Sequence, residues 1–247
     1  MLKRLEYLMS VDLQEIKDKK TPIVIPIGTM EYHGPHCALG CDTMIAIGAL
    51  EKLAERKDIV MAPPIWYGVA SYAVGGPENG TVQINVDVFE DYVYNILKSM
   101  LYGGFKNIYM VIQHQYEEGS LMPMTLACMK AGKKITMEYL EDTQGQGWWG
   151  SNRMAGYYES LTDPNANPFN WITTVPVISP AAQHATGYDH AGKFESSILM
   201  ALYPDAVKLE RIPESDAWFI QSAKEANVEL GLKMVDLSVK DLEKVII

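Results

Sequence analysis

The stretch Ile23-Val24-Ile25-Pro26-Ile27-Gly28 decides the fold, together with the segment Glu31-Tyr32-His33-Gly34-Pro35-His36-Cys37-Ala38-Leu39-Gly40-Cys41-Asp42 that follows it. A short, largely β-branched apolar run is typical of a strand that is buried on both faces of a sheet. The next segment is bent by glycine and proline and carries two carboxylates and two imidazoles. These oxygen and nitrogen donors are of the kind that hold Mn, Zn or Fe. Ligands of α/β proteins usually bind at the ends of strands.

Strand patterns and helix patterns alternate along the rest of the sequence. We expect strands at 23–27, 59–65, 107–113, 134–140 and 171–178. Helical spacing is found at 10–20, 43–56, 86–101, 120–131, 191–202 and 217–235, and loops are expected at 68–80, 142–150 and 184–192. This alternation predicts an α/β protein with a mostly parallel sheet covered on both faces. The length of 247 residues, 48% of them hydrophobic, fits one domain over residues 1–247.

The composition excludes several classes of protein. The net charge of −10 argues against binding to nucleic acid or to an anionic membrane surface. No apolar stretch approaches the length of a membrane span, and the first residues lack the apolar core of a signal peptide. Three cysteines give no disulfide framework. We therefore expect a cytoplasmic protein that has neither nucleic-acid nor membrane partners.

All five histidines fall in predicted loops or at predicted strand ends: His33, His36, His114, His184 and His190. Since the carboxyl ends of parallel strands share one edge of a sheet, the loops after three strands can converge there. The side chains that would meet are Glu31, His33, Asp42 and His114, with His190 and Glu195 approaching from a third loop. Two metals that share a bridging carboxylate suit this set.

These residues also carry a resemblance to a known family. The run from Pro26 to Thr43 resembles, with unbroken spacing, the signature of the creatininase (creatinine amidohydrolase) family. The segments 112–117 and 190–197 look like two further motifs of that family. The resemblance covers residues 22–200, which is most of the chain.

The resemblance implies a three-layer αβα sandwich with a mostly parallel central sheet, two divalent metal ions (Zn, Mn or Fe) per chain, and a homo-hexamer. Carried over by position, Glu31 and His114 would bind one metal, His33 would bind the other, and Asp42 would bridge them. His190 matches the histidine thought to move protons.

Two departures leave the fifth metal ligand open. Gln115 and Tyr116 replace glycines of the family, and Lys193 stands where the family has an acid. We expect Glu117 to supply the missing ligand and to assist proton transfer, with Glu195 as the next choice.

The sequence allows two interpretations of several residues. Trp148 and Trp149 form either an aromatic wall over the substrate or an interface anchor, and His184 either lines the pocket or caps a turn. For Lys193 we favour a substrate-binding cation over a surface ion pair. Cys37 and Cys41 could bind zinc, but no second cysteine pair exists, so small loop fillers are favoured. The expected substrate-binding residues are Tyr116, Trp148, Trp149, Lys193 and His184.

The expected function is a metal-dependent hydrolase that opens a small cyclic amide or cyclic keto-polyol with a metal-activated water. The departures from the family motifs favour a keto-inositol such as 3-dehydro-scyllo-inosose, and so inositol catabolism, over creatinine. A non-catalytic metal- or ligand-binding module is the alternative of a different class. A nucleotide-binding oxidoreductase is disfavoured because no Gly-x-Gly-x-x-Gly opens a helix after a strand.

Overall fold

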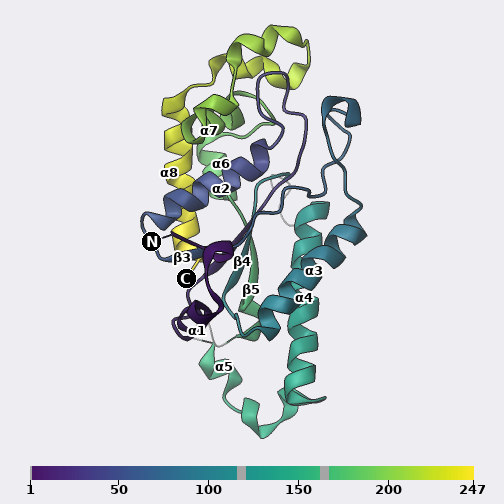
Figure 1. Cartoon of the computed structure of the whole chain (residues 1–247), viewed down its shortest axis with the longest axis vertical. Helices are drawn as coiled ribbons and strands as arrows, with labels where there is room; N and C mark the ends of the chain where they lie inside the picture. The colour runs from purple at the N-terminus through teal and green to yellow at the C-terminus, as the bar shows by residue number, and fades with distance from the viewer. Residues whose placement is uncertain (1, 116–120, 162–166) are drawn as a thin grey trace.

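The computed structural model describes residues 2–115, 121–161 and 167–247. A five-stranded sheet lies between two layers of helices (Figure 1), as the sequence predicts. The strands pair in the order β1-β3-β2-β4-β5, and every pair is parallel. The strands are β1 (Leu2–Arg4), β2 (Ile23–Ile27), β3 (Ile59–Met61), β4 (Ile108–Ile112) and β5 (Ile172–Pro176). The α-helices are α1 (Leu13–Asp18), α2 (Cys41–Ala54), α3 (Val86–Tyr102), α4 (Pro123–Gln144), α5 (Tyr157–Ser160), α6 (Pro180–Thr186), α7 (Lys193–Leu202) and α8 (Val228–Val245).

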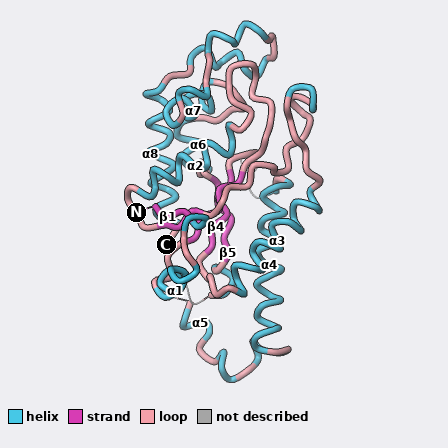
Figure 2. The backbone as a smooth tube through the Cα atoms, viewed as in Figure 1, coloured by secondary structure: helices cyan, strands magenta, loops and turns pink. Residues whose placement is uncertain are grey.

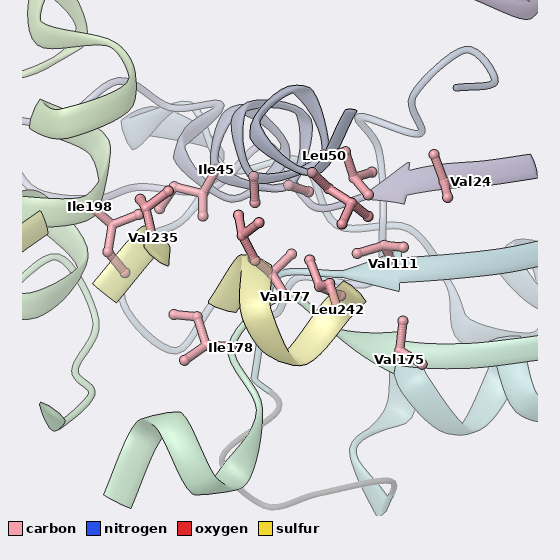
Figure 3. Close-up of a cluster of buried hydrophobic side chains, with 14 of the residues drawn as sticks. Val24, Ile45, Leu50, Val111, Val175, Val177, Ile178, Ile198, Val235 and Leu242 are labelled. Atoms are coloured by element: carbon pink, nitrogen blue, oxygen red, sulfur yellow. The ribbon is translucent and has the colours of Figure 1, made fainter. Parts of the chain in front are cut away.

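Side chains of the central strand β2 pack into two separate apolar cores. Ile23, Ile25 and Ile27 pack with residues of α3 and α4, whereas Val24 packs with residues of α2, α7 and α8. Successive side chains of a strand point to opposite faces, so a continuous apolar run fills both layers. Figure 3 shows the second of these cores, in which Val24 lies with Leu50 of α2.

Pro26 lies in the middle of β2 at a place where one neighbouring strand has already ended. Its carbonyl accepts a hydrogen bond from the Ile65 N–H, at 2.9 Å, and Ile65 lies beyond the end of β3. In a parallel strand the N–H and C=O of one residue face the same side. The missing N–H of Pro26 therefore removes no donor from the pairing with β4, which continues through Val111.

The order of the strands fixes where a ligand can bind. The chain passes from β2 to β3 on one side, then crosses to β4 on the other side of β2. Such a reversal opens a crevice at the carboxyl ends of the strands. The loops that follow β2 and β3 rise from this end of the sheet (Figure 2). Residues after β2 and β4 therefore meet at the crevice.

Several expected element boundaries are wrong. The expected strand at 134–140 belongs to α4, whose buried residues recur at helical spacing over its whole length. His184 lies in the short helix α6, which Ser179 caps and Pro180 opens, and not in a loop. The helix expected from residue 10 begins at Leu13, after a 3₁₀ turn. Strand β3 stops at Met61, although Ile65 still forms an isolated bridge with β2.

None of the helices within the described ranges is long and apolar enough to cross a membrane.

Candidate metal centre

Two groups of buried donors share the carboxylate of Asp42. In the first donor group, Nδ1 of His114 lies 3.3 Å from Glu31 Oε2 and 3.2 Å from Asp42 Oδ2. In the second donor group, Nε2 of His33 lies 3.6 Å from Asp42 Oδ1 and 3.4 Å from Glu195 Oε2. All five side chains are buried. The two oxygens of Asp42 thus face the two histidines separately, as a bridging carboxylate does.

Hydrogen bonds from outside each group orient its members. Nδ1 of His33 donates to the carbonyl of Glu31 at 2.9 Å, so the neutral ring carries its lone pair on Nε2. The hydroxyl of Thr29 donates to Asp42 Oδ2, also at 2.9 Å. Partners of this kind fix the tautomer and direction of metal ligands in proteins. The lone pair of His33 is therefore aimed at the second donor group.

Glu195 reaches the site because the backbone before α7 takes an unusual conformation. Ala191 has a φ of 52°, in the left-handed region, and its N–H donates to Glu195 Oε2 at 2.7 Å. The amide of Gln113, directly after β4, donates to Glu195 Oε1 at 3.4 Å. Strain of this kind persists only where the surrounding structure holds it. It is held here by His36, whose Nε2 donates to the Ala191 carbonyl at 3.0 Å.

The titration of the cluster reflects its crowded carboxylates. Burial alone lowers the pKa of His33 and of His114, but the neighbouring carboxylates outweigh it and raise the pKa of each to about 10. Burial likewise opposes the ionisation of Asp42, yet the charged imidazoles of His114 and His33 beside it hold its pKa well below the usual range. Burial raises the pKa of Glu195 to about 7. Without a metal, protons supply the positive charge that these carboxylates demand.

The donor set fits divalent cations. Among the described residues, Glu31 Oε2 and His33 Nε2 are buried, face the donor groups and have no hydrogen-bond partner. Buried polar atoms normally find a partner, so each such atom needs an explanation. A lone pair on His33 Nε2 facing two carboxylate oxygens is repulsive unless a proton or a cation lies between them. Imidazole and carboxylate ligands suit Zn and Mn.

A cavity of about 440 Å³ opens beside both donor groups and beside His190. Nε2 of His190 donates to the carbonyl of Tyr32 at 3.0 Å, and its ring centroid lies 4.4 Å from that of His33. Burial, reinforced by the charge of His33, lowers the pKa of His190 to about 4. His190 is therefore neutral at pH 7 and can accept a proton on Nδ1.

Four residues expected to bind substrate do not line this cavity. Nζ of Lys193 forms an ion pair with Glu225, at 2.9 Å. The structure thus shows the surface ion pair, and not the substrate-binding cation that we favoured. His184 is exposed on α6. Trp148 and Trp149 line a separate cavity with Met137 and Glu141 of α4. The end of α4 lies at the opposite end of the molecule from α7 (Figure 1). Trp148 and Trp149 therefore cannot form an aromatic wall over the candidate site of the same chain.

The expectation for Glu117 and Tyr116 falls on residues outside the described ranges. Both assignments stay predictions. Glu195, which ranked second as the fifth ligand, lies with one carboxylate oxygen 3.4 Å from His33 Nε2.

Sequence reasoning missed several residues of the site. The aromatic side chains that line the cavity are Tyr188, Phe194, Trp218 and Phe219, the last two from the 3₁₀ helix Trp218–Glu225. No local pattern could reveal them, because their position depends on how this segment packs over α7. Asp189 accepts the N–H groups of Phe194 and Glu195 at 3.0 Å each, and so fixes the start of α7. An acid just before a helix is a signal that could have been read.

A comparison with protein families shows the family of this chain. A family model described as creatininase (creatinine amidohydrolase) matches residues 6–245. The chain belongs to the creatininase family. Creatinine amidohydrolase from Pseudomonas putida is 22% identical over 193 residues, which cover 77% of this chain and 67% of that protein. A 3-dehydro-scyllo-inosose hydrolase from Thermotoga maritima is 30% identical over 115 residues, 45% of this chain and 36% of that protein.

Solved creatininase structures share the fold of this family member. One described as carrying Mn has a TM-score of 0.72 at 19% identity and covers 100% of this chain and 98% of that one. A mutant creatininase described as Zn-Zn type also has a TM-score of 0.72, at 18% identity, with 98% and 96% covered. A mutant creatininase complexed with creatine has a TM-score of 0.68 at 18% identity, with 100% and 98% covered.

Proposed function

We propose that this chain is a hydrolase that opens a small cyclic substrate with the help of two divalent metal ions. The observation that carries the proposal is the pair of buried donor groups joined by Asp42 at the edge of a cavity. Glu31, Asp42 and His114 would hold one ion, and His33, Asp42 and Glu195 would hold the other. The chemistry that such ions supply when bound is the activation of a water molecule and the polarisation of a carbonyl.

His190 is the group best suited to move protons. Because its Nε2–H is held by the Tyr32 carbonyl, the neutral ring presents Nδ1 as a base. Its Nδ1 takes a proton from the water that attacks the substrate carbonyl, and then gives that proton to the leaving atom of the opened ring. The lowered pKa of His190 keeps the base form present at neutral pH.

The walls of the cavity suit a compact ring with polar substituents. Tyr188, Trp218 and Phe219 offer flat apolar surfaces, and the amides of Gln113 and Gln183 offer hydrogen bonds. Hydroxyl-bearing carbon rings have apolar faces and polar edges of this kind. A cyclic keto-polyol therefore suits the cavity, and the Thermotoga maritima relative that acts on 3-dehydro-scyllo-inosose supports this choice over a cyclic amide.

The proposal is tested by incubating the protein, loaded with Zn or Mn, with 3-dehydro-scyllo-inosose and with creatinine separately. We expect acid release from the inosose. His190→Gln should lower the rate about 10²–10⁴-fold, the range of general acid–base catalysis. His184→Gln is the matched control, since this exposed histidine does not line the cavity.

Elemental analysis separates the hydrolase from its main alternative. A content of two metals per chain with turnover supports the proposal. Fewer than two metals and no turnover of either compound would instead favour a non-catalytic metal- or ligand-binding module.

A further inference from the structure

Cys41 lies against the second donor group and has no role in the function proposed above. It is the first residue of α2 and is fully buried. The ligand atoms of His33, Cys41 and Glu195 lie within 4.8 Å of one another. The neighbouring residue, Asp42, turns one carboxylate oxygen toward His33. The thiol is therefore beside atoms that would share one metal ion.

A packing role alone does not account for this thiol. Within the described part of the chain, the sulfur of Cys41 makes no hydrogen bond, whereas that of Cys37 lies 3.4 Å from the Ser196 hydroxyl. The second, independent observation is His33 Nε2, a fully buried and unpartnered nitrogen in the same group. The sulfur of Cys41 and the Nε2 of His33 therefore lie in one buried group, and neither has a hydrogen-bond partner among the described residues.

We propose that Cys41 is a thiolate ligand of the second metal position, beside His33, Asp42 and Glu195. This inference rests on the proposed two-metal function and adds a ligand to it. On binding, the sulfur–metal bond forms as the thiol proton leaves to solvent, so that the thiolate adds one negative charge to those of Glu195 and Asp42.

A sulfur ligand would make the two metal positions unequal. The first donor group contains only oxygen and nitrogen donors, which Mn accepts well. The second donor group would combine nitrogen, oxygen and soft sulfur, a set that favours Zn over Mn. The protein should therefore accept Mn at the first position while it keeps Zn at the second.

The decisive measurement is X-ray absorption at the zinc edge of the wild-type protein loaded with zinc. We expect a sulfur neighbour at about 2.3 Å from zinc. Replacing zinc with Co²⁺ should also give a sulfur-to-cobalt charge-transfer band in the near ultraviolet. Both signals should vanish in Cys41→Ser and persist in Cys37→Ser, the matched control.

A competition between metals gives a further readout. Cys41→Ser should weaken zinc binding at one position by roughly tenfold or more, a loss typical of altered metal sites, and shift its preference toward Mn. Zinc bound with only nitrogen and oxygen neighbours in the wild type would overturn the inference but leave the proposed function standing. A chain that binds no metal would overturn both.

Discussion

Gly28 allows the start of α2 to approach the end of β2 closely enough to place Asp42 between the two donor groups. A Cβ added at Gly28 would lie 2.5 Å from the backbone nitrogen of Thr43 and 2.6 Å from its hydroxyl. Real Cβ atoms essentially never lie within 3.0 Å of a non-bonded heavy atom. The backbone of Gly28 is not in the left-handed region, so Gly28→Ala changes space without adding backbone strain.

The expected effect follows from the size of the overlap. The substitution must move the start of α2 from β2 by at least about 0.5 Å, the tolerance within which a functional constellation has to be held. We expect overpacking to lower the free energy of unfolding by about 1–3 kcal/mol, a fall in Tm of roughly 2–12 °C for a chain of this size. Displacement of Asp42 should lower kcat/KM by on the order of 100-fold.

The assay combines thermal unfolding, metal content after dialysis and turnover. Gly150→Ala is the matched control, since a Cβ at Gly150 meets no atom within 4 Å. A Gly28→Ala protein that keeps the wild-type Tm and its full complement of metal would refute the reasoning, because the close approach would then not hold Asp42 in place.

Two further predictions concern the donors themselves. In the metal-free chain the pKa values of His33 and His114 are raised from an ordinary 6.5 to about 10. Protonation of these histidines therefore stabilises the folded chain. This contribution to the free energy of unfolding is fully present below pH 6.5 and is lost as the pH rises toward 10. With a chelator present, Tm should therefore fall between pH 7 and 10, and a Tm independent of pH would count against charged imidazoles. Glu195→Gln should lower the metal content from the proposed two ions per chain toward one, whereas Lys193→Ala, which removes the ion pair with Glu225 and the contact with the Phe194 ring, should keep two. Equal metal content in both variants would argue for another fifth ligand.

Local patterns predicted the parts of the site that lie close together in the sequence. The apolar run of β2 and the donors that follow it were readable because strand period and loop composition are local properties. The donors Glu31, His33, Asp42 and His114 lie together where the sequence predicted, and Glu195, the second choice for the fifth ligand, joins them. The position of His114, which is remote in sequence, could be predicted because the carboxyl ends of parallel strands lie at one edge of the sheet.

The remaining parts depend on packing that no short segment encodes. The close approach of Glu195 could not be read from the sequence, because it depends on Ala191 in the left-handed region, a conformation most often marked by glycine. The strand expected at 134–140 was wrong because Ile135 and Thr136 are β-branched, while the helical spacing of α4 outweighs this preference. Trp148 and Trp149 lie far from the site because α4 continues past the sheet.

The two donor groups draw on three segments of the chain that lie far apart in sequence: the loop after β2 with the first turn of α2, the end of β4, and the first turn of α7. During synthesis, the first segment leaves the ribosome long before Glu195 does, so no emerging fragment can present a complete second position. Metal loading is therefore expected to follow completion of the sheet, and a bound ion would stabilise only the finished fold. Cellular metal supply would then act on the lifetime of this protein as well as on its chemistry.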